Sequence, residues 1–388
     1  MNILICNVGS TSLKYQLFAM DEGERVIAAG GAERVGAAES LFYRTEQGER
    51  RQERYVLPTH REAIGRMLDA LPADAAVDCV GFKVVHAKGV TGVQYLTDEV
   101  LAAMEAFNSV APAHNPPYLA AIRQFRALLP GVPLIGSFET AFHAQMPPEV
   151  SLYSIPWELG ERHAIRRYGF HGASHEYMTE FAAERLGRRE FRLISCHLGG
   201  SGSITAVRDG RSVDTSMGLS LQCGVMQNNR IGDIDPYIIF YLAEECGMTL
   251  PEIKTMLQTK SGLLGMSGVS NDLRDVEAAA AAGNTRAQNA VKAYTYGIRK
   301  YIGSYAAALG GLDVITFGGG IGRNSAQVRE QALSGLEFLG VALDREKNRT
   351  AKGGDDISRA DSHVRIYVVD TNEELIVARK AAQLLGEN

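Results

Sequence analysis

The sequence predicts an α/β protein of two domains, and three observations support this. Strand-like and helix-like segments alternate along the chain, which is typical of the α/β class. The 388 residues are enough for two domains of about 100–200 residues each. A weak internal repeat places one strand–turn–strand pattern near the start of each half. Hydrophobic residues make up 45% and charged residues 22%, so a large core can form and a disordered chain is excluded.

The repeat consists of an apolar run, a Gly/Ser turn and an alternating strand. The apolar runs are residues 3–6 and 193–196, and the strands are residues 13–18 and 203–207. The aligned pairs are Cys6 with Cys196, Asn7 with His197, and Gly9 with Gly199. This pattern indicates a duplicated unit, and a chance match of two hairpins is the alternative.

Helices are predicted where apolar residues recur at helical spacing. The predicted helices are residues 175–186, 236–246, 276–282, 286–308 and 373–385. A strand at 314–317 leads into a third glycine-rich turn, G-G-G-I-G-R-N, at 318–324. No linker is evident between the two halves.

Charge and cysteine content exclude several classes of protein. The formal net charge is −5 and basic residues are scattered, which gives a nucleic-acid surface little support. The five cysteines are widely spaced and form no C-x-x-C pair, which argues against a disulfide framework or a zinc site. No stretch approaches the roughly 20 apolar residues that span a bilayer, and the N-terminus lacks the features of a signal peptide. We therefore expect a cytoplasmic protein without nucleic-acid or membrane partners.

The three glycine-rich turns after buried strands suit phosphate binding. Glycine has no Cβ, so backbone N–H groups in such turns can approach an anion closely. None of the turns is a Walker A loop or a convincing dinucleotide fingerprint. Each turn taken alone could be only a hairpin connection.

A longer series of motifs resembles one known family. Residues 7–14, N-V-G-S-T-S-L-K, are similar to an N-x-G-S-S-S-x-K signature, and residues 168–175, Y-G-F-H-G-A-S-H, to Y-G-F-H-G-T-S-H. Further blocks occur in the same order, at 214–218, at Arg230 with 232–236, at 261–265, 272–275 and 319–322, and at 371–375. On these motifs the chain is identified as a member of the acetate kinase family (acetate/propionate kinases, or acetokinases).

The resemblance implies a fold from the actin/Hsp70/sugar-kinase superfamily. Two duplicated actin-like ATPase (ribonuclease H-like) α/β domains are expected to flank a nucleotide cleft. The expected N-terminal domain is 1–142 plus 376–388, closed by the C-terminal helix, and the second, nucleotide-binding domain is 143–375. The resemblance also implies a homodimer.

The resemblance assigns roles to individual residues. The catalytic residues are Glu139, His171 and Arg230. The substrate-binding residues are Lys83, Val85, Ala113, His114, Phe170 and Leu221. The ATP-binding residues are Lys14, His197, Leu198, Gly199, Gly200, Ser201, Asp272, Leu273, Arg274, Gly319, Gly320, Ile321, Gly322 and Arg323. Asn7 and Glu373 are assigned to Mg²⁺, for which Mn²⁺ is an alternative, since magnesium accepts an incomplete shell of protein oxygens.

Simpler interpretations stand beside these roles. Arg230 could instead pair with Asp233 or Asp235, and His171 could be a hydrogen-bonded core histidine. Glu373 could only open the last helix, where an acid near the N-terminus is favourable. His114 could only organise its loop.

The chain departs from the family pattern at the substrate positions. Lys83 stands where the family has arginine, which keeps the charge but loses the bidentate fork. Glu139 replaces an aspartate and lengthens the side chain by one methylene. Ala113 replaces leucine, L-Q-C at 221–223 replaces P-L-E, and Arg323 replaces glutamate. The acid therefore stays open among acetate, propionate, a longer acid and a substituted one.

Three functions are consistent with this pattern. The first is reversible, ATP-dependent phosphorylation of acetate or propionate to an acyl phosphate by direct in-line transfer, a reaction that depends on positioning and charge neutralisation. The second is a kinase of the family for another small acid or with another phosphoryl donor. The third is a catalytically weak ATP-binding regulator.

Overall fold

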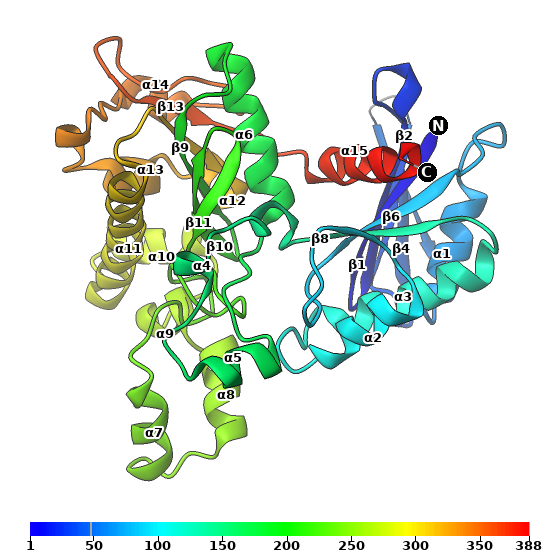
Figure 1. The fold of residues 1–388 in the computed structure, drawn as a ribbon, viewed down its shortest axis with the longest axis horizontal. Coiled ribbons are helices and arrows are strands. Elements are labelled where there is room, and N and C mark those ends of the chain that lie inside the picture. Colours follow the sequence, from blue (N-terminus) through cyan, green and yellow to red (C-terminus); the bar gives the residue numbers. More distant parts are fainter. Residues whose placement is uncertain (47–48, 388) are drawn as a thin grey trace. The chain divides into compact units, whose positions relative to one another are not determined.

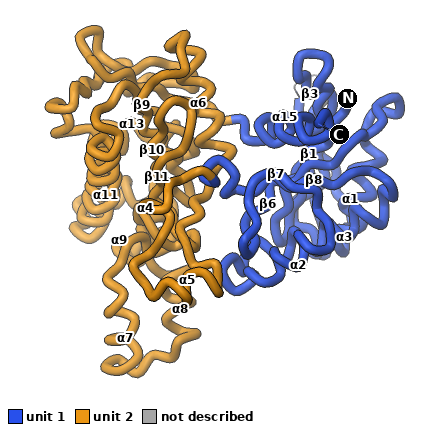
Figure 2. The backbone as a smooth tube through the Cα atoms, viewed as in Figure 1, with its two compact units in different colours: residues 1–144, 372–388 blue, residues 145–371 orange. Residues whose placement is uncertain are grey.

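The computed structural model describes residues 1–46 and 49–387, and the chain divides into two compact units (Figure 2). Unit 1 is Met1–Ala144 with Asn372–Asn388, and unit 2 is Gln145–Thr371. The sequence predicts the second boundary after residue 375, but the units change after Thr371. The reason is that α15 (Glu373–Gly386) packs from its start on the sheet of unit 1, so Glu373 belongs to unit 1.

Unit 1 is built on one mixed sheet with the strand order β5-β4-β3-β2-β1-β6-β8-β7. The strands are β1 Asn2–Gly9, β2 Ser12–Ala19, β3 Arg25–Glu33, β4 Ser40–Glu46, β5 Glu49–Tyr55, β6 Cys79–Val84, β7 Val93–Tyr95 and β8 Leu134–Phe138. The other helices are α1 His60–Asp69, α2 Asp98–Ala106 and α3 Asn115–Leu128, with short 3₁₀ turns η1 Met20–Glu22 and η2 Ala141–His143. Val377 and Ala381 of α15 join Ile3, Ile5 and Ile135 in a core cluster, which fixes α15 on this sheet.

Unit 2 has a five-stranded sheet with the order β11-β10-β9-β12-β13. Its strands are β9 Arg192–Leu198, β10 Gly202–Arg208, β11 Arg211–Thr215, β12 Val314–Gly318 and β13 Arg365–Val368. Its helices are α4 Pro148–Ser151, α5 Trp157–His163, α6 Gly172–Leu186, α7 Tyr237–Glu244, α8 Leu250–Thr259, α9 Gly262–Ser267, α10 Leu273–Ala281, α11 Thr285–Leu309, α12 Gly319–Asn324, α13 Ala326–Leu333 and α14 Arg345–Thr350, with η3 Glu337–Leu339. Helices α6 and α11 cover opposite faces of this sheet (Figure 1).

The two sheets share one strand topology. In unit 1 the hairpin β1–β2 is antiparallel, and β6 and β8 extend it in parallel on the side of β1. In unit 2 the hairpin β9–β10 is extended in the same way by β12 and β13. Cys6 pairs with Phe82 and Cys196 with Phe317, so the alignment of Cys6 on Cys196 keeps the register. The predicted duplication is confirmed in the topology.

Alternation along β9 and β10 divides their side chains between two environments, because successive residues of a strand point to opposite faces. Ile194, Cys196 and Ile204 belong to the apolar cluster that contains the buried face of α11. Ser195 and Ser203 point to the other face, where they contact residues of α6. A sheet buried on both sides therefore has one apolar face and one face that carries hydroxyl groups.

All five predicted helices are present, and several begin earlier than the apolar periodicity predicts. Helix α10 begins at Leu273, because the Asp272 carboxylate accepts a hydrogen bond from the backbone N–H of Arg274 as an N-cap. Helix α6 begins at Gly172, directly after His171. Residues assigned to ligand binding therefore lie at the N-termini of these helices. In the part of the chain that the structure describes, no helix is long and apolar enough to cross a membrane.

Candidate active site

Three charged residues meet at the carboxyl ends of the inner strands β6 and β8 of the unit 1 sheet. Lys83 lies on β6, Glu139 directly follows β8, and Glu373 is the first residue of α15. Lys83 Nζ lies 2.5 Å from Glu373 Oε2 and 3.2 Å from Glu139 Oε1. Because β6 and β8 run in parallel, their carboxyl ends lie side by side, which is where ligands bind in open α/β sheets.

The two carboxylates hold Lys83 as a cation. Burial by itself would lower the pKa of Lys83, but the nearby Glu139 and Glu373 outweigh this, and its pKa is raised well above the usual value. Only 8% of the Glu139 side chain and 16% of the Glu373 side chain are exposed. One ammonium and two carboxylates leave one net negative charge in a largely buried group.

Asn7 is oriented by a residue that the sequence does not single out. The buried Tyr118 of α3 donates from Oη to Asn7 Oδ1 at 2.8 Å. Burial raises the pKa of Tyr118, so the phenol keeps its proton and acts as the donor. Lys14 on β2 is the cross-strand partner of Asn7, which places the two assigned residues side by side.

The donor atoms near the edge of the unit 1 sheet are of the type that magnesium accepts. Asn7 offers a carboxamide oxygen and Glu373 a carboxylate, and Mg²⁺ commonly binds one or two such groups and completes its shell with water and phosphate oxygens. Among the described residues no group of three or more His, Cys, Asp or Glu side chains is gathered for a metal ion. The chemistry of these two donor groups suits magnesium.

In unit 2, two imidazole rings stack beside the glycine-rich turn at 199–202. His171 adopts the left-handed backbone conformation, with φ of 59°, and its ring stacks on His197 with the centroids 4.2 Å apart. His171 Nδ1 lies 2.8 Å from Ser203 Oγ, and His197 Nδ1 lies 2.7 Å from Ser174 Oγ. Each ring is therefore held through Nδ1 by a serine hydroxyl.

Arg230 is a half-buried cation held by neutral acceptors. Its Nη1 donates to Ser201 Oγ at 3.1 Å and to Gln227 Oε1 at 3.2 Å. Within the described residues it forms no ion pair, so the alternative of a pair with Asp233 or Asp235 is wrong. Burial lowers the pKa of Arg230, which means that its charge is not compensated by a carboxylate. An arginine in this environment favours an anionic ligand.

The loop that carries Arg230 is clamped between two elements. Asn228 N donates to Gly200 O at 3.3 Å on one side, and Leu263 N of α9 donates to Gln227 O at 2.9 Å on the other. Gly262 has a φ of +62°, and a Cβ there would lie 2.1 Å from Gln227 O, so only glycine fits. The S-G-L-L-G block at 261–265 therefore supports the arginine loop.

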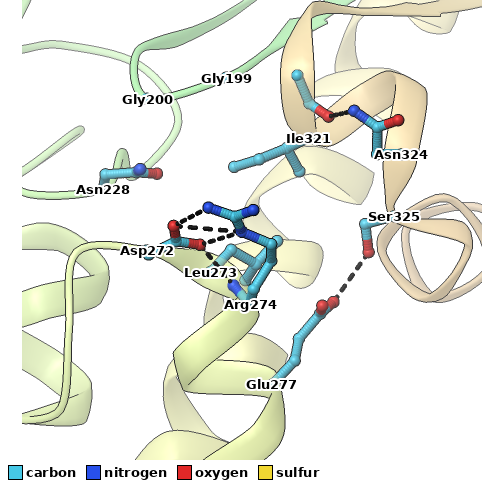
Figure 3. A pocket seen from close by; sticks show the side chains of 11 residues that line it. Gly199, Gly200, Asn228, Asp272, Leu273, Arg274, Glu277, Ile321, Asn324 and Ser325 are labelled. Carbon is cyan, nitrogen blue, oxygen red and sulfur yellow. Dashed lines mark hydrogen bonds and ion pairs between the residues drawn. The ribbon is translucent and has the colours of Figure 1, made fainter.

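A cavity of about 490 Å³ opens beside the glycine-rich turns of unit 2 (Figure 3). Its lining residues are Gly199, Gly200, Asn228, Asp272, Leu273, Arg274, Glu277, Gly320, Ile321, Asn324 and Ser325. The turns meet closely, since a Cβ on Gly319, whose φ is +73°, would lie 2.6 Å from Leu198 O. Close backbone approach leaves the cavity room for a nucleoside-sized ligand.

Two polar pairs set the electrostatics of the cavity. Figure 3 shows the Arg274 guanidinium folded onto the Asp272 carboxylate, and hydrogen bonds from Arg274 lower the pKa of Asp272 to about 2. On the other side, burial raises the pKa of Glu277, although Ser325 Oγ donates to its carboxylate at 2.8 Å. One wall is therefore ion-paired, and the other carries a half-buried acid.

The match to known proteins extends over almost the whole chain. The sequence pattern of the acetokinase family matches residues 2–379. An acetate kinase of Geobacillus sp. is 45% identical over 391 residues, which cover 98% of each chain. This chain belongs to the acetokinase family.

Solved structures of acetokinases agree with this assignment. The crystal structure of Porphyromonas gingivalis acetate kinase matches with a TM-score of 0.89 at 38% identity and covers 99% of each chain. A propionate kinase from Francisella tularensis matches with a TM-score of 0.90 at 34% identity and covers 98% of each chain. The predicted fold class of two duplicated actin-like ATPase domains is confirmed. The family also confirms two further predictions, a phosphotransferase with a carboxyl acceptor and ATP as its co-substrate.

The structure distributes the assigned residues unevenly. Seven of them line the cavity of unit 2, namely Gly199, Gly200, Asp272, Leu273, Arg274, Gly320 and Ile321. His197, Leu198, Ser201, Gly319, Gly322 and Arg323 belong to the same turns and helix but are not among the lining residues. Arg323 pairs instead with Asp370 at 3.0 Å.

The expected substrate residues belong to two units. Val85, Ala113 and His114 lie in unit 1 with Lys83, while Phe170 and Leu221 lie in unit 2. Val85, Phe170 and Leu221 are buried, His114 is half-buried and Ala113 is exposed.

The structure places several further residues beside the assigned ones, to which the sequence analysis gave no role. They are Tyr118 on Asn7, His175 and Ser203 behind His171, and Asn228, Glu277, Asn324 and Ser325 in the cavity wall. One signal for Ser203 was present in the sequence. In the strand at 203–207 the polar residues Ser203 and Thr205 alternate with apolar residues, and Ser195 is a single polar residue in the apolar run at 193–196.

Proposed function

We propose that this acetokinase transfers the γ-phosphoryl group of ATP to a small carboxylate, acetate or propionate in the first place, and that the reaction is reversible. The bond between the γ-phosphorus and the oxygen that bridges to the β-phosphorus breaks, and a bond to a carboxylate oxygen forms. The products are an acyl phosphate and ADP. The single observation that carries this proposal is Arg230, a half-buried arginine whose side chain donates to neutral acceptors beside the glycine-rich turn at 199–202.

The cavity of unit 2 is the proposed nucleoside site. Gly199, Gly200 and Gly320 present backbone without side chains toward the phosphates, while Ile321 and Leu273 supply apolar surface for the base. These features fit ATP, because a nucleotide needs an apolar slot that continues into a set of N–H donors.

Arg230 and His171 are the proposed stabilisers of the moving phosphoryl group. Phosphoryl transfer is catalysed mainly by positioning and by donors that face the charge on the equatorial oxygens. Arg230 supplies a charge that no carboxylate neutralises, and His171 supplies a ring held in place by Ser203. Both act from unit 2.

Lys83 and Glu139 are the proposed carboxylate-handling pair of unit 1. Lys83 offers an ammonium to the substrate carboxylate, and its bonds to Glu139 and Glu373 determine where that ammonium lies. A point charge holds a carboxylate less tightly in orientation than a guanidinium fork. The acid pocket therefore tolerates acids other than acetate.

Asn7 and Glu373 are the proposed residues for Mg²⁺. A bound Mg²⁺ would neutralise negative charge on the phosphate oxygens of ATP. Tyr118 orients the Asn7 oxygen for this purpose, and Lys83 holds Glu373.

One assay separates the three functions. The protein is incubated with ATP, Mg²⁺ and each of a panel of small carboxylates, and hydroxylamine traps any acyl phosphate as a coloured hydroxamate complex. Product with acetate or propionate supports the proposal. Product only with another acid, or only with another phosphoryl donor, supports the second function. Nucleotide binding without product from any acid supports a regulator.

We also propose a homodimer that uses the surface of α7. This helix has no buried residue, and Tyr237, Phe240 and Tyr241 expose 75%, 54% and 63% of their surface. Such a cluster on a helix marks an association surface. The change Phe240→Glu with Tyr241→Glu should give a monomer in light scattering after size exclusion. The control is Tyr296→Glu, at an exposed tyrosine of α11. A dimer that survives the double change excludes α7 as the interface.

A further inference from the structure

Glu277 is a half-buried acid at one end of the cavity of unit 2 (Figure 3). Gly199 and Gly200 lie toward the other end, where the phosphates are proposed to bind. Ile321 and Leu273, the proposed apolar surface for the base, lie between the two ends. Glu277 is therefore placed where the edge of a bound base would reach.

Two helices lead from the phosphate end of the cavity to Glu277. Helix α10 starts after its N-cap Asp272 and reaches Glu277 five residues later, and Ser325 directly follows α12, which starts at Gly319. Five residues of α-helix rise about 7.5 Å, enough to pass a ribose and reach the base. The two helices are joined at this far end, because Ser325 Oγ donates to Glu277 Oε1 at 2.8 Å.

The Glu277 carboxylate has unused capacity to accept hydrogen bonds. Ser325 Oγ accepts a hydrogen bond from Val328 N–H at 3.2 Å and gives its own proton to Glu277 Oε1. Within the described residues Glu277 Oε2 has no hydrogen-bond partner, and no cation pairs with the carboxylate. An ionised carboxylate only accepts, so a donor group on a ligand would bind here and an acceptor group would be repelled.

We propose that Glu277 determines the base specificity of the nucleoside site: its carboxylate accepts a hydrogen bond from the exocyclic amino group of adenine. The inference rests on the proposed function, since it names the group that reads the base in the proposed ATP site. Adenine carries an amino donor at C6, whereas hypoxanthine carries a carbonyl acceptor at the same position. The site should therefore take adenine nucleotides in preference to hypoxanthine nucleotides.

The test compares two nucleotides that differ at the C6 edge of the base. Isothermal titration calorimetry of the full-length protein with Mg²⁺ measures the Kd values of ADP and inosine diphosphate. ADP should bind about tenfold more tightly, the effect of one hydrogen bond to a charged acceptor. Equal Kd values, or tighter binding of inosine diphosphate, overturn the proposal.

One variant separates recognition of the base from a structural role. Glu277→Gln keeps the shape of the side chain and the acceptor for Ser325, and its amide can also donate to the hypoxanthine carbonyl. The preference for ADP should therefore fall to within about twofold. A structural role would weaken both nucleotides alike and leave their ratio unchanged, and that result overturns the proposal.

The matched control removes the same charge elsewhere on α10. Asp275 is an exposed acid two residues before Glu277, and Asp275→Asn should leave both Kd values unchanged. If Asp275→Asn lowers the preference as much as Glu277→Gln does, the effect comes from helix charge and the inference is wrong.

Two further outcomes keep the inference separate from its assumptions. If Glu277→Gln does not fold, the 5′-diphosphate of purine riboside takes its place, because that base carries only hydrogen at C6. It should bind the unchanged protein about tenfold more weakly than ADP, and an equal Kd overturns the proposal. The titrations need no turnover. Equal Kd values in a protein that makes acyl phosphate refute this inference alone, whereas a protein that binds neither nucleotide refutes the proposed nucleoside site as well.

Discussion

At one equivalent position of the two duplicated sheets, unit 1 carries a lysine and unit 2 a glycine. Lys83 of β6 and Gly318 of β12 each follow a phenylalanine that pairs in parallel with the first strand of its unit. Lys83 binds two carboxylates, whereas a Cβ on Gly318 would lie 2.8 Å from the sulfur of Met178. The same backbone frame therefore supports side-chain charge in one unit and close approach of a helix in the other. Duplication preserved the sheet and left the strand ends free to diverge.

The largest expected effect concerns the acidic end of unit 1. Removal of divalent metal by excess chelator should abolish activity, because the phosphates lose their counter-charge. Glu373→Ala should raise the Mg²⁺ concentration for half-maximal activity more than it raises the Kd for nucleotide. Activity titrations with Mg²⁺ and nucleotide-binding titrations measure the two effects. Glu374→Ala, one residue further along α15, is the control. Full activity in excess chelator would remove Asn7 and Glu373 from a metal site.

The next largest effect is expected at Arg230 of unit 2. Arg230→Ala should lower kcat by a factor of about 10²–10⁴ with a smaller change in the KM for ATP, because its charge is most important in the transition state. Steady-state kinetics measure both constants, and circular dichroism checks folding. Arg230→Lys keeps the charge and should retain part of the activity. An unchanged kcat in a folded Arg230→Ala protein contradicts the proposed role.

The third prediction concerns the cation and acid that differ from the family. Some small acid other than acetate should have the higher kcat/KM by about tenfold, since one methylene in an apolar pocket is worth about 1–3 kcal/mol. The double change Lys83→Arg with Glu139→Asp should shift this preference toward acetate. Kinetics over a panel of acids measure the ratio, and each single change serves as the comparison. If acetate is the best acid and the double change leaves its kcat/KM unaltered, the differences have no effect on specificity.

The smallest effect is expected at Arg323, where the family has glutamate. Arg323 pairs with Asp370 in a largely exposed ion pair, and such pairs contribute about 0–1 kcal/mol to the free energy of unfolding. Arg323→Glu should therefore lower stability by about 1 kcal/mol and change the KM for ATP less than threefold. Chemical denaturation and steady-state kinetics are the measurements. A large change in nucleotide preference would show that Arg323 reaches the nucleotide after all.

Local patterns were enough to predict the strands, the glycine-rich turns and the main helices. These features depend on periodicity and on residues next to each other in the chain. The expected alternative of an ion pair between Arg230 and Asp233 shows that closeness in sequence does not predict which side chains pair. Asp233 is three residues away, yet its carboxylate accepts from Tyr301, which lies 68 residues along the chain, at 2.5 Å.

The contacts of the residues that the sequence analysis did not assign depend on how the strands and helices pack. Tyr118 meets Asn7 across 111 residues, and His175 meets Ser203 across 28. Such contacts depend on which strands pair and which face a helix covers, and composition carries no information on either. The unit boundary after Thr371 is of the same kind, because only the packing of α15 reveals that Glu373 belongs with β6 and β8.

The position of α15 has a consequence for biosynthesis. A ribosome makes the strands of unit 1 first, then all of unit 2, and only afterwards the helix that completes the apolar cluster around Ile3, Ile5 and Ile135. While unit 2 emerges, the nascent unit 1 exposes that surface and lacks Glu373. Unit 1 therefore folds completely only after unit 2 has been translated, and a chain truncated before α15 has neither a closed core nor the carboxylate that Lys83 binds.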